Sequence, residues 1–300
     1  MKHPLLTLLL ISVLSCGSSK QVAQNKTPEV NPEEITKDSI PVPSDTIETL
    51  VKTDTIKAPE AETQIAINNA PNNNENDTAA EIEISQTLAN HQLWTNLLQK
   101  HVSNAGNVNY QSFKTDRSLL KDYITSLSGN MPDDTWSKND ILAYWINAYN
   151  ALTVDLILRH YPTKSIKDIK KPWDQRYWKL GDKWYNLNEI EHEILRKMDE
   201  PRIHFAIVCA SFSCPKLQNT AFEAADLDAQ LTLATKTFIN DPKRNTLTPN
   251  KIEISKIFSW FAKDFGGSGN IINYINKYAD IKIPNNTSKR FKDYDWALND

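Results

Sequence analysis

Two cysteines five positions apart carry the most reactive side chains in the second half of the chain. Cys209 and Cys214 follow an apolar run, residues 203–208, which comes directly after Arg202 and includes His204. We expect this run to be a strand that ends in a turn of small residues. A thiol in such a turn lies near backbone N–H groups, which can stabilise an oxyanion during acyl transfer. Cys209 is therefore a candidate nucleophile.

A nucleophilic thiol needs a basic neighbour that favours the thiolate. Two histidines are candidates for this base, His204 and His192. Side chains alternate along a strand, so His204 and Cys209, five positions apart, should point to opposite faces. We therefore prefer His192, which lies in a predicted helix, with Glu189 or Glu191 on the same helix to orient its imidazole.

The third cysteine, Cys16, lies at the end of a segment typical of an export signal. Lys2 precedes an apolar core at residues 4–14, and the small residue Ser15 stands directly before the cysteine. The segment is too short to remain as a membrane-spanning helix. It resembles the lipobox of bacterial lipoproteins, which implies cleavage before Cys16 and lipidation of its thiol, with an ordinary signal peptide as the alternative. We therefore predict a cell-envelope protein that is lipid-anchored to a membrane, periplasmic or outer.

Export leaves two other interpretations of Cys209 and Cys214 open. An oxidising compartment favours a disulfide between them, and the short loop would make its entropic contribution modest. A redox-active pair is a weaker version, because four residues rather than two separate the thiols. A zinc site built from both cysteines, His192 and His204 matches no familiar ligand spacing, so we predict no metal.

The composition divides the chain into three parts. After the signal at residues 1–16, residues 17–85 contain no aromatic residue, six prolines and 13 acidic against five basic side chains. Such a segment buries too little apolar surface to offset the entropy of ordering, so we predict a disordered tether. Residues 86–300 are slightly basic but have no stripe of basic and aromatic residues, so we predict no nucleic-acid partner.

Residues 86–300 are predicted to form one helix-rich α+β domain with a small β-sheet. Residues 138–160 are apolar nearly all round, which is typical of a central core helix. Asn147 and Asn150 share a face of this helix, where they either hold neighbouring loop backbone or line a site. Asn188 is predicted to cap the helix that carries His192. Further helices are expected at residues 87–102, 115–128, 223–240, 256–264 and 270–278, with a hairpin within 173–187 and a strand at 251–254.

Several polar and aromatic residues are candidates for binding a substrate. Arg202 either pairs with a carboxylate, Glu191 or Asp295, or contacts a ligand, and Trp296 either docks the C-terminus or lines a cleft. Eight tryptophans would suit a peptide or glycan ligand, although tryptophan is more often found in a core. The Gly-rich residues 266–269 lack the lysine and spacing of a phosphate loop, and we predict no cofactor. The candidate binding residues are Asn147, Asn150, Arg202, His204 and Trp296.

Taken together, four short motifs resemble domain-of-unknown-function family 547. They are AYWINAYNALT at 143–153, IEH at 190–192, RIHFA at 202–206 with Cys209 and Cys214, and YDWALN at 294–299. The resemblance extends over nearly all of residues 90–300, and bacterial members of the family are often exported lipoproteins. The family brings no established activity. We therefore expect an envelope lipoprotein that is either a thiol-dependent hydrolase or transferase acting on a peptide or amide, or a non-catalytic binding or structural protein with a Cys209–Cys214 disulfide.

Overall fold

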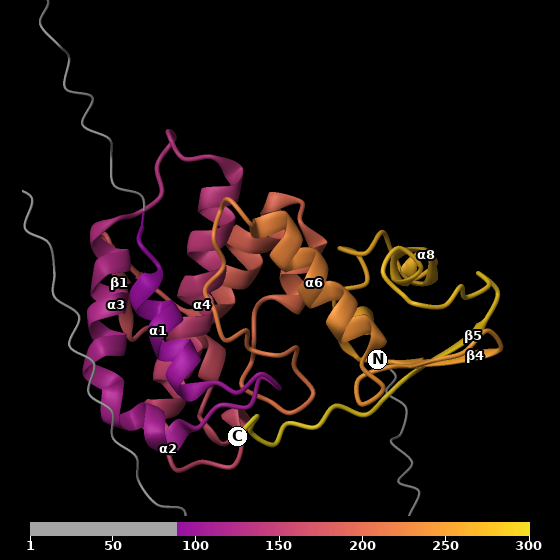
Figure 1. The fold of residues 1–300 in the computed structure, drawn as a ribbon, viewed down its shortest axis with the longest axis horizontal. Helices are drawn as coiled ribbons and strands as arrows, with labels where there is room; N and C mark the ends of the chain where they lie inside the picture. Colours follow the sequence, from indigo (N-terminus) through magenta and orange to yellow (C-terminus); the bar gives the residue numbers. More distant parts are fainter. Residues whose placement is uncertain (1–88) are drawn as a thin grey trace, which may run out of the picture. The chain divides into compact units, whose positions relative to one another are not determined.

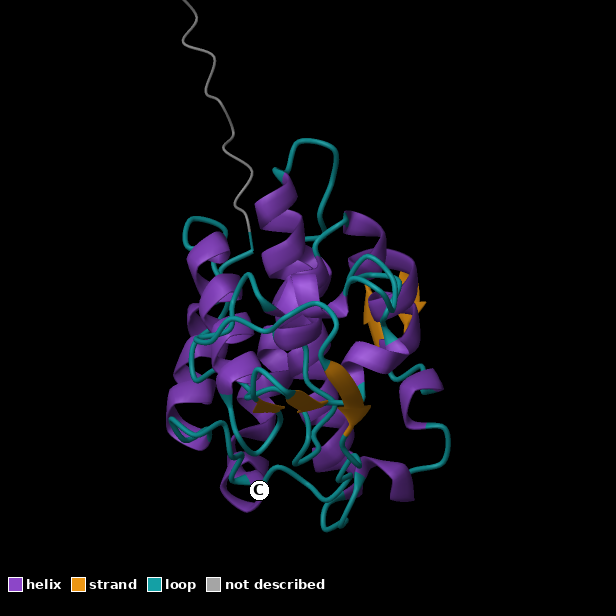
Figure 2. Ribbon diagram, turned by 90° about the vertical axis from the view of Figure 1, so that its right-hand side faces the viewer, coloured by secondary structure: helices purple, strands orange, loops and turns teal. Residues whose placement is uncertain are grey.

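The computed structural model describes residues 89–300 of the chain. The predicted signal peptide, the lipidation of Cys16 and the tether of residues 17–85 lie outside these residues. The described part is helix-rich with two small β-sheets, which confirms the predicted α+β class (Figures 1 and 2).

A long central helix, α4 (Lys138–His160), organises the first half of the fold, with the bounds that the sequence predicted. Ser137 caps it through a reciprocal pair of hydrogen bonds with Asp140. Residues 142–158 are all buried, so the helix runs through the core. It is long and apolar enough to cross a membrane. However, 94% of its apolar 18-residue stretch is buried inside the fold, as expected of a core helix.

Shorter elements cover α4. They are α1 (Gln92–His101), α2 (Tyr110–Phe113), α3 (Arg117–Gly129) and the hairpin of β1 (Trp178–Leu180) and β2 (Lys183–Tyr185). The hairpin turns at Gly181, whose φ of +56° favours glycine. The predicted hairpin is confirmed. Asp155 on α4 is buried and bound by Arg117, Arg159 and the Trp178 indole, which ties these elements together.

A second apolar cluster lies in the C-terminal part of the fold. It is built on α6 (Leu227–Asn240), α7 (Ile257–Trp260), α8 (Ile271–Ile275) and a sheet of β3 (Thr246–Leu247), β4 (Lys251–Ile254) and β5 (Ser288–Phe291). The sheet order is β3-β4-β5, in which β3 and β4 are antiparallel and β4 and β5 are parallel. The predicted strand at 251–254 is confirmed.

The strand expected at residues 203–208 is wrong. A 3₁₀ helix, η6 (Pro201–Phe205), begins at a proline in its first position, and irregular backbone continues to Cys209. The run is apolar because it lies between the two clusters: Ile203 and Val208 pack in the first and Phe205 in the second. Burial on both sides gives a continuous apolar stretch that resembles a buried strand in sequence.

The helix that carries His192 begins two residues earlier than predicted. Asn186, not Asn188, accepts a hydrogen bond from the Glu189 N–H and caps α5 (Leu187–Glu189). The chain continues as the π-helical turn η4 (Ile190–Ile194) and then as η5 (Leu195–Met198). The wider π-turn changes the directions of side chains relative to a regular α-helix.

Candidate functional site

A cleft of about 490 Å³ contains several of the residues singled out from the sequence. Cys209, His192, His204 and Trp296 all line it. Its walls hold six aromatic side chains: Tyr149, Trp173, Trp260, Phe261, Tyr294 and Trp296. Concave sites lined by aromatic groups with a few polar side chains are typical of ligand binding.

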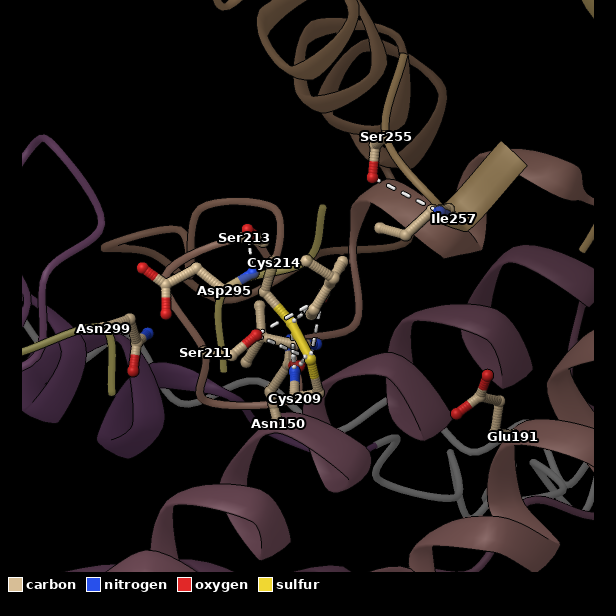
Figure 3. The surroundings of a disulfide bond; sticks show 12 residues. Asn150, Glu191, Cys209, Ser211, Ser213, Cys214, Ser255, Ile257, Asp295 and Asn299 are labelled. Carbon is tan, nitrogen blue, oxygen red and sulfur yellow. Dashed lines mark hydrogen bonds between the residues drawn. A yellow bond between two sulfur atoms is a disulfide. The ribbon is translucent and has the colours of Figure 1, made fainter. Parts of the chain in front are cut away.

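The two cysteines form a disulfide that lines the cleft (Figure 3). Their Cα atoms are 6.1 Å apart. Cys214 is only 3% exposed, whereas Cys209 is half-buried. Of the interpretations considered for the two cysteines, the structure therefore shows the disulfide.

Hydrogen-bond donors surround the sulfur atoms. The Cys209 backbone N–H donates to Cys214 Sγ at 2.9 Å. The Tyr294 hydroxyl lies 3.2 Å from each sulfur, and the Ser211 hydroxyl lies 3.3 Å from both Cys209 Sγ and the Tyr294 oxygen. Burial raises the pKa of Tyr294 to about 12, so its hydroxyl remains a donor at neutral pH.

Asn150 positions the backbone that leads to the disulfide. Its Nδ2 donates to the Ala206 carbonyl at 3.0 Å, and its Oδ1 accepts from the Val208 N–H at 2.9 Å. Asn147 clamps Phe222 in the same way, at 2.8 and 2.9 Å. Both amides hold loop backbone, which is the first of the two roles considered for them, and neither side chain lines the cleft.

The C-terminal segment holds the far side of the cysteine loop. Ser211 forms a β-bridge with Leu298, and the Phe212 N–H donates to the Ala297 carbonyl at 2.7 Å. This pairing brings Tyr294 and Trp296 into the cleft wall, although they are more than 80 residues from Cys209 in the sequence.

His192 and Glu189 are not connected to the sulfur atoms by hydrogen bonds in the described part of the chain. Arg196 Nη1 lies 2.9 Å from His192 Nδ1, and burial together with the Arg196 charge lowers the pKa of this histidine. Glu189 instead pairs with Arg176 and Lys183. Within residues 89–300, His192 and Cys209 therefore line the same cleft, whereas Glu189 does not line it.

His204 belongs to a second polar group in the cleft wall. Its Nε2 lies 2.7 Å from Asp264, and its ring stacks on Phe261 with centroids 4.0 Å apart. Burial lowers the pKa of His204 although Asp264 opposes this shift, and the Nε2–H of the ring donates to the carboxylate. Burial opposes ionisation of Asp264, but hydrogen bonds from Arg196 and His204 outweigh it and hold the pKa of this carboxyl well below its usual range.

Glu191 is the cleft carboxyl whose environment differs most from water. It is 8% exposed and accepts a hydrogen bond from the Tyr149 hydroxyl at 3.0 Å. Burial raises its pKa from 4.5 to about 7. The sequence suggested Glu191 as an alternative to Glu189 and as a possible partner of Arg202, but not as a buried carboxyl of the cleft. The sequence does contain a signal that Glu191 faces inward, because Glu191 lies between Ile190 and Leu195, two apolar residues that pack in the core.

Arg202 does pair with carboxylates, which was one of its two predicted roles, but the suggested partners Glu191 and Asp295 are wrong. Arg202 binds Glu200 at 2.6 Å and Asp228 at 2.7 Å, and it does not line the cleft. The reason is local, because Glu200 caps η6 and accepts a hydrogen bond from the Arg202 N–H, which brings the two side chains together.

Three tryptophans give the cleft an aromatic wall. The ring of Trp296 lies 5.9 Å from Trp260 at 27° and 5.8 Å from Trp173 at 74°. The Trp260 side chain is 47% exposed, a large apolar surface left in contact with water. Lys167 lies over Trp296, 4.9 Å from the ring centroid. Trp296 thus both lines the cleft and fixes the C-terminal segment.

Metal ligation has no geometric support in residues 89–300. No group of three or more His, Cys, Asp and Glu side chains there is arranged to hold a metal ion. Two of the four proposed zinc ligands, Cys209 and Cys214, are bonded to each other. A disulfide lacks the thiolates that bind zinc.

Fold and cleft together define a helix-rich α+β domain with an aromatic cleft beside a disulfide. Residues 134–239 match a family described as "Protein of unknown function, DUF547", which supports the resemblance of this part of the domain to that family. The matched segment includes α4, Glu191 and both cysteines, whereas Tyr294 and Trp296 lie beyond it. No curated protein and no solved structure matches the chain.

Proposed function

We propose that this protein is a non-catalytic binding protein of the cell envelope whose aromatic cleft holds a glycan. The observation that carries this proposal is the cleft itself, in which tryptophan rings stand beside cysteines that are already bonded. A bonded cysteine has no thiolate for nucleophilic attack. With the cysteines bonded, the cleft still offers ring faces and hydrogen-bonding groups that can recognise a ligand.

A sugar ring suits the two kinds of surface that the cleft offers. One face of a sugar ring is apolar and stacks on the exposed ring of Trp260 or on Trp296. Its hydroxyl groups need partners, and Glu191 offers carboxyl oxygens inside the cleft. A pKa of about 7 lets Glu191 accept or donate a hydrogen bond near neutral pH.

Calorimetry that measures the binding of cell-wall glycan fragments to the full chain tests this proposal. Trp260→Ala and Trp296→Ala should each weaken binding about tenfold through the lost stacking surface. Trp184→Ala is the matched control, since Trp184 is 52% exposed but lies outside the cleft. If all three variants bind the glycan fragments as tightly as the wild type does, the proposal of a glycan in this cleft is refuted. Binding of wall peptides but not glycans would change the ligand class.

A thiol-dependent hydrolase or transferase is the second candidate. It is favoured by the half-exposure of Cys209 in the same cleft as His192 and His204. This activity requires reduction of the disulfide, after which a histidine would have to reach the Cys209 sulfur. Reduced protein that cleaves a peptide or amide, with loss of cleavage in Cys209→Ala, would support it. Equal cleavage by that variant would exclude it.

We also propose that a lipid on Cys16 attaches the protein to a membrane. The lipobox-like sequence supports this proposal, and the acidic tether predicted after it would hold the domain away from the lipid surface. Mass spectrometry of the exported protein should find acyl chains on an N-terminal Cys16. Cys16→Ser should release the protein from the membrane fraction. An unlipidated N-terminus would contradict the anchor.

A further inference from the structure

We propose that the Cys209–Cys214 bond is a thiol–disulfide exchange site, in which a small thiol in the cleft attacks Cys209 and Cys214 leaves as a thiolate. This inference adds a redox activity to the cleft and does not depend on glycan binding. It rests on the unequal exposure of the two cysteines and on the hydrogen-bond donors around Cys214 Sγ.

Access selects Cys209 as the sulfur that is attacked. Both cysteines line the cleft, but Cys209 is half-buried whereas Cys214 is only 3% exposed. An incoming thiolate attacks one sulfur and expels the other, and access decides which. The cleft of about 490 Å³ admits a thiol of low molecular mass.

Two donors stabilise Cys214 as the leaving group. The Cys209 N–H lies 2.9 Å from Cys214 Sγ, and the Tyr294 hydroxyl donates to the same atom at 3.2 Å. The Ser211 hydroxyl donates to the Tyr294 oxygen at 3.3 Å, which extends the chain of donors. Hydrogen bonds to a charged form lower its energy, so these groups favour the Cys214 thiolate.

The surrounding loop is held by contacts other than the S–S bond. Asn150 clamps Ala206 and Val208, and the C-terminal segment pairs with Ser211 and Phe212. These contacts do not require the sulfurs to be bonded. Opening the disulfide therefore leaves the cleft in place, as a reversible exchange requires.

The exchange balances with two equivalents of thiol. The first thiolate forms a mixed disulfide with Cys209 and releases the Cys214 thiolate, which takes up a proton. A second thiolate attacks the sulfur of the bound thiol and releases the Cys209 thiolate. The small thiol is oxidised to its disulfide, and the protein disulfide is reduced to two thiols.

The exchange is tested with the full chain in mixtures of reduced and oxidised glutathione. The reaction is stopped by rapid alkylation, and the products are identified by peptide mass spectrometry. We expect exchange in the folded protein, a mixed disulfide on Cys209 in Cys214→Ser, and at least tenfold slower labelling of Cys214 in Cys209→Ser.

Tyr294 is a positioning residue in this proposal, with its own readout. Tyr294→Phe should slow exchange about tenfold, the loss expected for one hydrogen bond to a charged group. In a Cys209→Ser background it should also raise the pKa of the Cys214 thiol, measured by thiolate absorbance. Tyr177→Phe is the matched control, because Tyr177 is partly buried but lies outside the cleft.

Three results would overturn the proposal. The disulfide could open only at the rate of global unfolding, which would make it a structural bond. The mixed disulfide could form equally fast on Cys214, which would remove the role of access. Tyr294→Phe could leave both the exchange rate and the pKa of the Cys214 thiol unchanged, which would remove the role of the donors.

Discussion

Glu191→Gln should make the protein more stable at neutral and alkaline pH but not at acidic pH. The wild-type carboxyl has a pKa of about 7 in the fold, against 4.5 for an ordinary glutamate, because burial disfavours its charge. Between these pH values the folded chain binds a proton that the unfolded chain has lost. The contribution of Glu191 to the free energy of unfolding therefore falls as the pH rises from about 4.5 to about 7.

The size of this effect follows from the shift in pKa. A difference of about 2.5 units corresponds to about 3 kcal/mol that ionised Glu191 costs the fold. Glutamine keeps a carbonyl oxygen that can accept from the Tyr149 hydroxyl, so the variant removes the charge with little change in shape. The free energy of unfolding of the variant should equal that of the wild type at about pH 4 and exceed it by about 3 kcal/mol at about pH 8.

Urea unfolding of the wild type and Glu191→Gln across this pH range measures the difference directly. Subtracting the two curves cancels the other titrating groups, among them His192 and His204 in the same cleft. Glu193→Gln is the control: Glu193 is exposed, and its hydrogen bond with Lys197 lowers rather than raises its pKa. A difference for Glu191→Gln that does not change with pH would refute the assignment of a protonated carboxyl.

Three further predictions concern stability, each measured as a free energy of unfolding. Asn150→Ala should destabilise the fold by about 2–4 kcal/mol, because it leaves two buried backbone groups without partners; a change below about 1 kcal/mol would contradict the clamp. Asp155→Ala should cost about 3–5 kcal/mol, since it strands two arginines and an indole N–H; a neutral result would show that water replaces the carboxylate. Replacing both Cys209 and Cys214 by serine should cost only about 2 kcal/mol, because the loop they close is short; unfolding of this variant would make the disulfide the main support of the loop.

The sequence predicted the elements whose signals are local. The central helix is found from its long apolar run and its Ser137–Asp140 cap, and the hairpin from the glycine turn between aromatic residues. In each case the residues that form the signal also make the contacts. Residues 203–208 show the limit of this approach, because burial between two clusters produces the same apolar run as a strand.

The site was predictable in part, since Cys209, His192, His204 and Trp296 do share one cleft. The sulfur environment was not predictable, because its main donor, Tyr294, reaches Cys209 only through the pairing of the C-terminal segment with the cysteine loop. That pairing depends on backbone hydrogen bonds, which carry little sequence information. The preference for His192 as a base rested on the alternation of side chains along a strand at residues 203–208, and that strand is absent. A π-turn and Arg196 determine where the imidazole of His192 points.

Tyr294 also links the binding and exchange proposals for the cleft. Its hydroxyl donates to a sulfur, while its ring lies 4.6 Å from Trp296 in the aromatic wall. A ligand stacked on Trp296 would therefore cover the approach to Cys209 and slow exchange. Glycan fragments that bind the cleft should protect the disulfide from glutathione in proportion to their occupancy. Binding without protection would place the ligand on the outer face of Trp260, away from the sulfurs.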